Sequence, residues 1–426
     1  MNYQQAIEWI NSFDRNQVKL GLDRIKNLCD RFNNPQIKYD TVHVAGTNGK
    51  GSVCRIVAEI LKQAGHKTGL YTSPHLNSYK ERFMVDGREI TKDELVEIIK
   101  LIKPVVNDLD EELKPTYFEI STLIAFLFFN MKKVDIAVIE VGLGGRFDAT
   151  NIVEPLVTVI TNISLEHQRF LGEKIEEIAY EKAGIIKEKI PLVTAANNNA
   201  LEKIKEIAGE KHTKTYLVDK DKYTLQHHRI NDQGFIVHGM KGDYSVDTRL
   251  NGSFQGENIA LSVYVAELLQ DKGYLITDKH IKQGITNVEN PGRIEIIQNK
   301  PYIILDGAHN PDGIEKLSLF LKNEIKYDKL IVILGILSDK NIKEMIKNIL
   351  PIVDILIITK SRNTRACEPN EILSLIDKKD LVDKIIQTEK IDEAVKKAQE
   401  LADKKDLICI TGSLFTVAEA RRILIS

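Results

Sequence analysis

The 426-residue chain has little net charge, few cysteines and no long apolar run, and each shortage excludes a class of protein. A formal net charge of −2 gives no electrostatic basis for binding nucleic acid or an anionic membrane. The apolar run from Leu123 to Met131 is shorter than the roughly 20 residues that cross a bilayer. The four cysteines lack the spacing of metal ligands, so we expect reduced thiols at Cys29, Cys54, Cys367 and Cys409.

The first residues and the bulk composition indicate an ordinary globular protein. Met1-Asn-Tyr-Gln-Gln lacks the basic and apolar regions of a signal peptide, so we expect a cytoplasmic protein. Apolar residues make up 43% of the chain and charged residues 28%, which is typical of globular proteins. The length predicts two or three domains.

The stretch His43-Val-Ala-Gly-Thr-Asn-Gly-Lys-Gly-Ser52 carries the chemistry of a nucleotide phosphate site. Its three glycines allow consecutive N–H groups to point at phosphate oxygens. Lys50 can reach the β- and γ-phosphates, and a hydroxyl can join a magnesium shell. An expected strand, 41–45, precedes the loop, and an expected helix, 52–63, follows it with a dipole that favours anions. The common pattern G-x-x-x-x-G-K-S/T is not matched, because Val44 and Gly51 occupy two of its fixed positions.

Strands alternate with helices along most of the chain, which indicates parallel sheets with crossover helices. An amphipathic opening covers 4–32, and residues 212–250 are rich in β-forming pieces. Further expected strands are 68–72, 134–141, 157–160, 302–305, 330–334, 355–359 and 407–411, and further helices are 92–107, 118–131, 175–187 and 258–270. The pair Pro291-Gly292 breaks both helix and strand and marks a linker. We therefore predict an α/β fold with a P-loop ATP-binding domain built on a mostly parallel sheet, residues 1–289. A smaller Rossmann-like α/β domain covers residues 290–426.

Two polar side chains follow apolar strands of the first domain. Glu140 ends the run Val134-Asp-Ile-Ala-Val-Ile-Glu140, and a carboxylate there must be paired, hydrogen-bonded or bound to metal. His167 ends the next such unit. Carboxylate oxygens suit Mg²⁺ beside a nucleotide, whereas a neutral imidazole is an unusual magnesium ligand. A helix-capping carboxylate and an ordinary surface histidine are the structural alternatives.

The loop Gly46-Thr-Asn-Gly-Lys-Gly-Ser52 resembles that of the Mur-type ATP-dependent amide ligases, and glycine after the lysine is typical of their folate branch. Segments in the same order almost end to end resemble the folylpolyglutamate synthase and dihydrofolate synthase family. They are Gly21–Arg24, Tyr71–Leu76, Glu81-Arg82, Thr116–Glu119, Glu140–Arg146, Asp148–Asn151, Glu181–Ile185, Phe254–Asn258, Pro291–Arg293, Asp306–Pro311 and Thr411–Phe415. The resemblance implies a monomeric ligase that joins L-glutamate to a folate or dihydropteroate carboxylate with ATP and Mg²⁺.

The resemblance also implies roles for single residues, which we expect to recur at the matching positions. The triphosphate cradle is Asn48, Gly49, Lys50, Gly51 and Ser52. The nucleotide is held from the far side by Asn258, Arg293 and Asp306, with Arg293 at an interdomain hinge. The magnesium ligands are Ser73, Glu140 and His167. His309 lies near the reacting phosphate, and the pterin or its acyl end is surrounded by Phe118, Arg146 and Asp148. The chain departs from the family at Glu166, where aspartate is commoner, so the carboxylate beside His167 has one more methylene.

Lys182 in Tyr180-Glu-Lys-Ala-Gly184 has two possible roles. By itself it is a surface lysine on a solvated helix face. The resemblance implies instead a lysine that carries CO₂ as a carbamate and supplies an oxygen to a second magnesium ion. That role requires an unprotonated amine, which burial favours.

The implied mechanism begins with phosphorylation of the carboxylate by ATP, after which the amine of glutamate attacks the acyl phosphate. Lys50, Arg293 and magnesium would spread the charge of the transferring phosphate, and His309 could stabilise it. Closure of the second domain about Pro291-Gly292 would exclude water; an ordinary rigid linker is the alternative.

Three other functions compete. A Mur-type peptidoglycan-precursor ligase shares the chemistry, but about 45 residues before the loop are too few for its nucleotide-sugar domain. A small-molecule P-loop kinase does not explain Asp306 and His309. A non-catalytic ATP-binding protein would have lost reactive groups. The shared motifs do not separate dihydrofolate synthase from folylpolyglutamate synthase.

Overall fold

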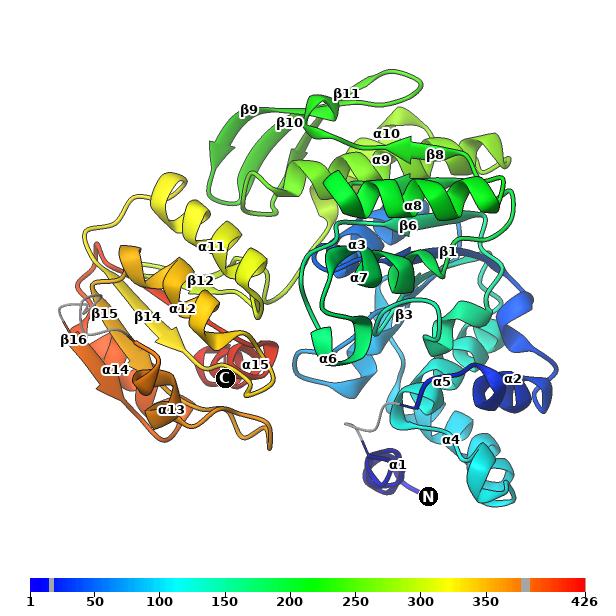
Figure 1. Ribbon diagram of the computed structural model, residues 1–426, viewed down its shortest axis with the longest axis horizontal. Coiled ribbons are helices and arrows are strands. Elements are labelled where there is room, and N and C mark those ends of the chain that lie inside the picture. Colours follow the sequence, from blue (N-terminus) through cyan, green and yellow to red (C-terminus); the bar gives the residue numbers. More distant parts are fainter. Residues whose placement is uncertain (15–18, 377–383, 426) are drawn as a thin grey trace. The chain divides into compact units, whose positions relative to one another are not determined.

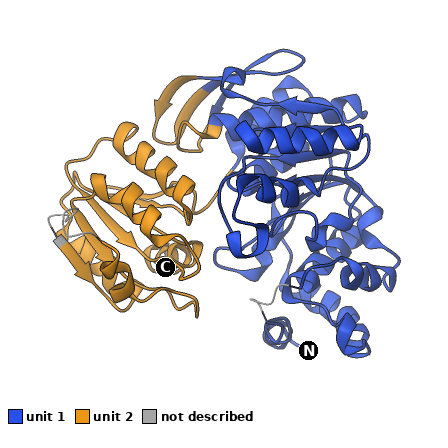
Figure 2. Cartoon of the chain, viewed as in Figure 1, with its two compact units in different colours: residues 1–224, 235–247, 256–288 blue, residues 225–234, 248–255, 289–426 orange. Residues whose placement is uncertain are grey.

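The computed structural model describes residues 1–14, 19–376 and 384–425. They form two compact units (Figure 2). The first unit consists of residues 1–224, 235–247 and 256–288, and the second of residues 225–234, 248–255 and 289–426. In the part of the chain that is described, no helix combines the length and apolarity that a membrane crossing requires.

The first unit is built on an eight-stranded sheet of order β4-β3-β2-β5-β1-β6-β7-β8 (Figure 1). The strands are β1 (Asp40–Ala45), β2 (Thr68–Tyr71), β3 (Phe83–Val85), β4 (Arg88–Glu89), β5 (Ile136–Glu140), β6 (Val157–Ile160), β7 (Leu192–Thr194) and β8 (Thr215–Leu217). All neighbours pair in parallel except at the β2–β3–β4 edge, which is antiparallel. The prediction of a mostly parallel sheet is confirmed.

Register brings the polar ends of the central strands to one edge of this sheet. Val44 of β1 lies opposite Glu140 of β5, and Ala45 lies opposite Ile160 of β6. The strands are rich in apolar residues because they are buried on both faces, as parallel strands usually are. Loops that follow β1, β5 and β6 therefore emerge together, where ligands of open α/β sheets collect.

Helices of the first unit surround this sheet. They are α1 (Tyr3–Asn11), α2 (Asp23–Asp30), α3 (Lys50–Gln63), α4 (Lys92–Asn107), α5 (Tyr117–Lys132), α6 (Gln168–Leu171), α7 (Ile175–Ala183), α8 (Asn198–Glu210), α9 (Gln255–Asp271) and α10 (Asp278–Asn287). Helix α5 is buried along most of its length and packs with α1, α2 and α4 around one apolar core.

Helix boundaries differ from the prediction at several places, including both ends of α5 and of α9. The amphipathic opening is two helices, α1 and α2. Helix α3 begins at Lys50 instead of Ser52, because Gly49 is the last residue with positive φ. Helix α7 ends at Ala183 instead of Lys187. Gly184 follows it, and glycine has a low helix propensity.

The β-rich stretch predicted at 212–250 contains a three-stranded sheet of order β11-β10-β9. Its strands are β9 (Tyr223–Arg229), β10 (Asp232–His238) and β11 (Asp243–Thr248), and its residues are divided between the two units. Buried Glu267 of α9 anchors the turn between β10 and β11, since its carboxylate accepts the N–H groups of Met240 (2.7 Å) and Lys241 (2.8 Å).

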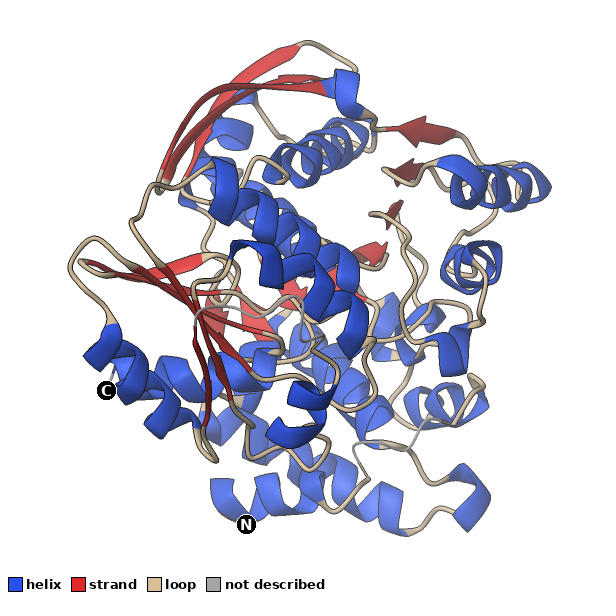
Figure 3. Ribbon diagram, turned by 60° about the vertical axis from the view of Figure 1, so that its left-hand side comes forward, coloured by secondary structure: helices blue, strands red, loops and turns tan. Residues whose placement is uncertain are grey.

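The second unit contains a six-stranded sheet of order β12-β13-β17-β14-β15-β16. Among the described strands of this sheet, β12 pairs with β13 in antiparallel fashion and the other neighbours pair in parallel. The strands are β12 (Glu295–Asn299), β13 (Tyr302–Leu305), β14 (Leu330–Leu334), β15 (Ile355–Ile358), β16 (Lys384–Gln387) and β17 (Leu407–Thr411). The helices are α11 (Pro311–Asn323), α12 (Ile342–Ile349), α13 (Pro369–Ser374), α14 (Ile391–Leu401) and α15 (Leu414–Ile425), and they lie on both faces of the sheet (Figure 3). The strands and helices that were predicted to alternate after residue 290 therefore form a second α/β unit.

Candidate active site

The predicted phosphate loop lies at the carboxyl end of central strand β1 and leads directly into α3. Gly46 (φ 142°) and Gly49 (φ 85°) adopt backbone conformations that side chains disfavour. Both positions are also crowded. A Cβ at Gly46 would overlap the Thr161 hydroxyl, and one at Gly49 would overlap the amide of Asn258. The two glycines are therefore required by the fold of the loop, and the side chain of Asn258 lies against Gly49.

Residues after β6 hold the loop in place, and sequence reasoning missed them. Asn162 accepts the Thr47 N–H on its main-chain oxygen (2.7 Å) and the Asn48 N–H on its side-chain oxygen (3.0 Å). The Thr161 hydroxyl donates to the Asn48 carbonyl (2.6 Å). Their position as polar residues directly after an apolar strand was the available signal.

Two lysines meet at one carbonyl of this loop. The Lys50 ammonium donates to the carbonyls of Gly46 (2.9 Å) and Thr47 (3.0 Å). Lys182, at the end of α7, donates to the same Gly46 carbonyl at 2.7 Å. The structure therefore brings Lys182 to the phosphate loop, although 136 residues separate it from Gly46.

Lys182 is buried, with 2% of its surface exposed, so the interpretation as a solvated surface charge is wrong. Burial and the neighbouring Lys50 charge lower its pKa from 10.5 to about 7, against the opposing influence of Glu166 and Asp148. A substantial fraction of the amine is therefore unprotonated near neutral pH, which is the condition for addition of CO₂.

Glu140 lies at the end of β5, also beside the phosphate loop. Its carboxylate accepts the Ser73 N–H (2.9 Å) and would lie 3.7 Å from a Cβ at Gly51. Two of the three predicted metal ligands, Ser73 and Glu140, are therefore adjacent, and both stand next to the first turn of α3. The side chain of Ser52, the cradle hydroxyl in that turn, is buried.

His167, the third predicted ligand, precedes the short helix α6 in a left-handed conformation (φ 50°). Its Nε2 lies 3.3 Å from a carboxylate oxygen of Glu166. The glutamate that departs from the family pattern thus contacts the imidazole, and it also influences the pKa of Lys182. The longer side chain is accommodated between these two groups.

Among the described residues, no three or more His, Cys, Asp and Glu side chains are arranged as a complete metal site. The donor chemistry nevertheless fits Mg²⁺. This ion takes one or two carboxylates from the protein and completes its octahedron with phosphate oxygens and water. A nearly buried carboxylate next to a phosphate loop meets that requirement.

The three residues predicted for the pterin substrate lie on or against the loop after β5. A Cβ at Gly142 would overlap the Phe118 ring, so that ring packs on the loop backbone. The Arg146 guanidinium donates to Glu181 (2.6 Å) and lies over the ring of Tyr180 (5.0 Å). Buried Asp148 accepts the N–H groups of Gly142 and Leu143.

The remaining predicted residues, Arg293, Asp306 and His309, form a cluster within the second unit. The Asp306 carboxylate accepts the N–H groups of Ile294 (2.9 Å) and Ala308 (2.9 Å). A Cβ at Gly307 would lie 3.3 Å from Nη1 of Arg293. His309 donates from Nδ1 to the Gly307 carbonyl (2.8 Å), because a carbonyl can only accept, and this leaves Nε2 as its second polar atom. Burial raises the pKa of Asp306, while Arg293 opposes that shift.

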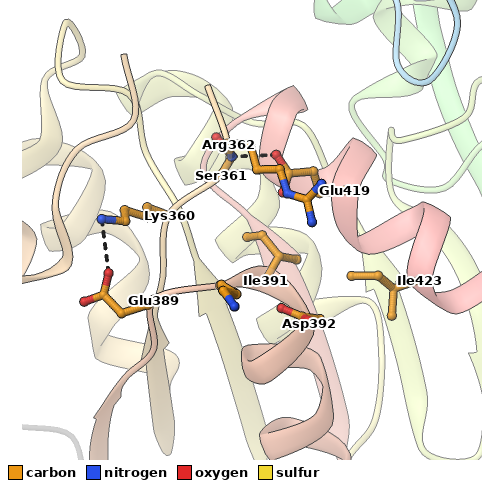
Figure 4. Close-up of a pocket in the computed structure, with 9 residues that line it drawn as sticks. Lys360, Ser361, Arg362, Glu389, Ile391, Asp392, Glu419 and Ile423 are labelled. Carbon is orange, nitrogen blue, oxygen red and sulfur yellow. Dashed lines mark hydrogen bonds and ion pairs between the residues drawn. The ribbon is translucent and has the colours of Figure 1, made fainter. Parts of the chain in front are cut away.

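A hollow of about 250 Å³ on the second unit contains none of the predicted residues (Figure 4). Three of its charged side chains, those of Lys360, Glu389 and Glu419, have partners. Lys360 lies 3.1 Å from Glu389 and 2.7 Å from Glu368, and the Arg362 N–H donates to Glu419 (2.6 Å). We assign this hollow no role.

Comparison with protein families places the whole arrangement in a known class. The Mur ligase middle domain matches residues 44–266, which contain the phosphate loop, Glu140, His167 and Lys182. The Mur ligase glutamate ligase domain matches residues 292–414, which contain Arg293, Asp306 and His309. The chain is therefore an ATP-dependent, amide-bond-forming ligase with a Mur ligase fold.

Similar proteins narrow the class to one family. The chain is 37% identical over 430 aligned residues to the dihydrofolate synthase/folylpolyglutamate synthase of Bacillus subtilis, with 99% of each chain covered. Its structure matches Mycobacterium tuberculosis folylpolyglutamate synthase complexed with ADP (TM-score 0.93, 30% identity, 99% and 98% of the chains covered). It also matches E. coli FolC in complex with DHPP and ADP (TM-score 0.88, 28% identity, 100% and 98% covered). The chain spans about half the length of two further curated relatives. It belongs to the folylpolyglutamate synthase/dihydrofolate synthase family, as the sequence motifs predicted.

Proposed function

We propose that the protein joins L-glutamate to the carboxylate of dihydropteroate, of a folate, or of both, through an acyl phosphate formed with ATP. The observation that carries the proposal is the buried Lys182 amine on the Gly46 carbonyl of the phosphate loop. A small-molecule kinase needs the loop but has no need of a second, buried lysine with a lowered pKa. Family membership favours this function over that of a Mur-type peptidoglycan-precursor ligase.

The cradle would hold the triphosphate through Asn48, Gly49, Lys50, Gly51 and Ser52, with Asn258 against it. An ammonium has three donors, and Lys50 uses two of them on loop carbonyls, so one remains for a phosphate oxygen. The positive end of the α3 dipole would act on the same phosphates. Arg293 and Asp306 would contribute to nucleotide binding from the second unit, and His309 would stabilise the transferring phosphate or orient the groups around it.

Ser73, Glu140 and His167 would hold Mg²⁺. The ion would supply charge neutralisation for the phosphates, which dominates catalysis of phosphoryl transfer. The Glu140 carboxylate is already oriented by the Ser73 N–H.

Lys182 would add CO₂. Its neutral amine would attack the carbon of CO₂, a new N–C bond would form as one C=O π pair moves onto oxygen, and the nitrogen would release a proton to solvent to give a carbamate anion. The anion would place a further oxygen donor at the phosphate loop, where a second Mg²⁺ would use it. The pKa of about 7 supports this step because it makes the neutral amine available.

Phe118 and Arg146 would contact the pterin-bearing substrate, and Asp148 would shape the loop that carries Arg146 and packs against Phe118. L-glutamate would attack the acyl carbon, and phosphate would leave. We further propose functional domains of residues 1–289 and 290–426, a monomer, and a cytoplasmic location.

Side-by-side assays test the proposal. ADP release is measured with L-glutamate and either dihydropteroate or tetrahydrofolate, and products are identified by mass. We expect turnover that requires ATP, glutamate and at least one pterin carboxylate. Turnover with a Mur-type precursor in place of the pterin, or ATP hydrolysis independent of both substrates, would contradict the proposal. The pterin used identifies the reaction, and light scattering tests the monomer.

A further inference from the structure

His43 is a buried histidine that the proposed chemistry does not use. It lies in the middle of β1, is fully buried, and has neighbours on both sides in β5 and β6. Its Nε2 lies 2.8 Å from the Thr150 hydroxyl. Among the described residues, its other nitrogen, Nδ1, has no hydrogen-bond partner. A buried nitrogen without a hydrogen-bond partner destabilises the folded state, so an apolar side chain at this position would stabilise the core more.

The direction of the hydrogen bonds follows from the next contact. The Thr150 hydroxyl donates its only proton to Oδ1 of Asp148, at 2.5 Å. The hydroxyl can therefore only accept from His43, so Nε2 carries the hydrogen. Burial lowers the pKa of His43 to about 3, which keeps the ring neutral with Nδ1 unprotonated. His43, Thr150 and Asp148 form a relay with one polarity.

The relay ends on the backbone of the loop after β5. Asp148 accepts the N–H groups of Gly142 (3.0 Å) and Leu143 (2.9 Å), as well as the Thr150 N–H (3.0 Å). Since the carboxylate is buried, these donors determine its position, and the carboxylate in turn fixes the start of the loop. A residue on the central strand is thereby connected to the glycine-rich segment 142–148.

This segment touches two parts of the proposed site. Gly142 packs on the Phe118 ring, where any side chain would overlap the ring. A Cβ at Gly145 would lie 2.7 Å from the Lys182 carbonyl and 2.8 Å from the Glu181 carbonyl, so the loop also packs on the end of α7. A shift of the segment would move the surface that faces the pterin-bearing substrate.

We propose that His43 is a positioning residue that acts through Thr150 and Asp148 to hold the 142–148 loop in the conformation that binds the pterin-bearing substrate. The proposal rests on the proposed function for the identity of that substrate. It accounts for a histidine at a core position where an apolar side chain would avoid an unpartnered nitrogen.

Matched variants test the relay. His43→Leu removes the donor at similar size, whereas His43→Gln keeps an N–H near the position of Nε2. Thr150→Val removes the hydroxyl and Thr150→Ser keeps it. Thr158→Val is the control. Thr158 is the registered neighbour of His43 in β6, and its buried hydroxyl has no hydrogen-bond partner among the described residues.

We expect His43→Leu and Thr150→Val to raise the KM for the pterin substrate about tenfold, the effect of one hydrogen bond, with the KM for ATP within about twofold. The donor-retaining variants should stay near wild type, and Thr158→Val should be unchanged. If either donor-free variant fails to fold, the other carries the test. An unchanged pterin KM, or equal rises for pterin and ATP, would overturn the proposal, because the latter would mean a disturbed phosphate loop.

Amide hydrogen exchange separates this inference from the proposed function. Protection of the Gly142 and Leu143 amides should fall in His43→Leu and Thr150→Val but not in Thr158→Val. If the wild type turns over no pterin substrate, the proposed function fails, yet the exchange measurement still decides whether His43 positions the loop. Unchanged protection in both variants would refute the relay.

Discussion

The two units use buried charge at their strand ends in different ways. In the first unit, two lysines share the Gly46 carbonyl, and the Glu140 carboxylate lies next to the same loop. In the second unit, each oxygen of the Asp306 carboxylate is matched to a backbone N–H. In the first arrangement the Lys50 and Lys182 side chains lie close together, and the pKa of the Lys182 amine is strongly lowered. The second satisfies its carboxylate within the backbone.

This difference predicts which of the two clusters mainly affects activity and which also affects the stability of the fold. Like charges that lie close together destabilise the folded state, so their presence indicates a functional role. We therefore expect substitutions in the first cluster to lower activity more than stability. Saturated backbone contacts hold a turn in place, so we expect the second cluster to limit stability as well. The following substitutions test this contrast, from the largest expected effect to the smallest.

Lys50→Ala should give the largest loss of activity. Removing a charge that acts on the transferring phosphate costs at least about 10²-fold in kcat by analogy with oxyanion donors. Because Lys50 is partly exposed and donates to carbonyls of its own loop, the melting temperature should change little. Near-wild-type turnover of the folded variant would show that the first cluster does not take part in catalysis.

Lys182→Ala should lose most of the activity, and acetate or formate should restore part of it. The small carboxylate would occupy the position of the carbamate oxygens. Lys50→Ala in the same buffers is the control and should not be rescued. Full activity of Lys182→Ala without any added carboxylate would show that no carbamate is needed.

Glu140→Ala and His167→Ala should each raise the Mg²⁺ concentration for half-maximal activity at least about tenfold, the lower end of effects seen even for outer-shell metal partners. Glu140→Gln keeps an acceptor for the Ser73 N–H but removes the charge, so it separates metal binding from loop support. If both alanine variants titrate with Mg²⁺ like the wild type, the two side chains are structural.

Asp306→Ala should destabilise the second unit. The substitution orphans two N–H groups, at roughly 1–3 kcal/mol each where water cannot replace the carboxylate. Exposed Glu315 on α11 offers a control, since Glu315→Ala should stay within about 0.5 kcal/mol. Equal urea midpoints for the two variants would contradict the structural part of the contrast.

Lys182→Met tests the burial of the same lysine through the pH dependence of stability. The pKa of Lys182 is about 7 in the folded protein and near 10.5 when unfolded. Between these values the unfolded chain binds more protons, so wild-type stability rises with pH. The advantage of the methionine variant should therefore be largest at pH 7 or below and shrink as pH rises toward 10. Urea unfolding in CO₂-free buffer measures it, and a constant difference would contradict the lowered pKa.

Local pattern was enough to predict the phosphate loop and many of the elements. Helix α4 and strands β6, β13, β14 and β17 have the predicted bounds, because their periodicity and flanking turn residues are unambiguous. Motif order further indicated the family. The predicted end of helix α7 was wrong. Hydrophobic residues continue past Ala183, and their pattern does not show that the helix stops there and the chain continues into the core.

Contacts between segments that are distant in the chain could not be predicted from the sequence. The place of Asn162 after an apolar strand signals a polar site, but it does not indicate that Asn162 holds Thr47 and Asn48. Likewise, nothing near His43 indicates a contact with Thr150, 107 residues away. The local sequence around Lys182, with Glu181 beside it, is also typical of a solvent-exposed helix.

The sequence by itself determined the chemistry available to this protein: a glycine-rich loop with a lysine, carboxylates after apolar strands, and the α/β order that brings them to one sheet edge. Local residue preferences and hydrophobic periodicity act over a few residues, so they can be read from the chain. The tertiary structure alone decided that Lys182 is buried against Gly46 and that His43 reaches the loop through Thr150 and Asp148. Burial and proximity to other charges set a pKa and a hydrogen-bond direction, and both exist only after distant segments have packed together.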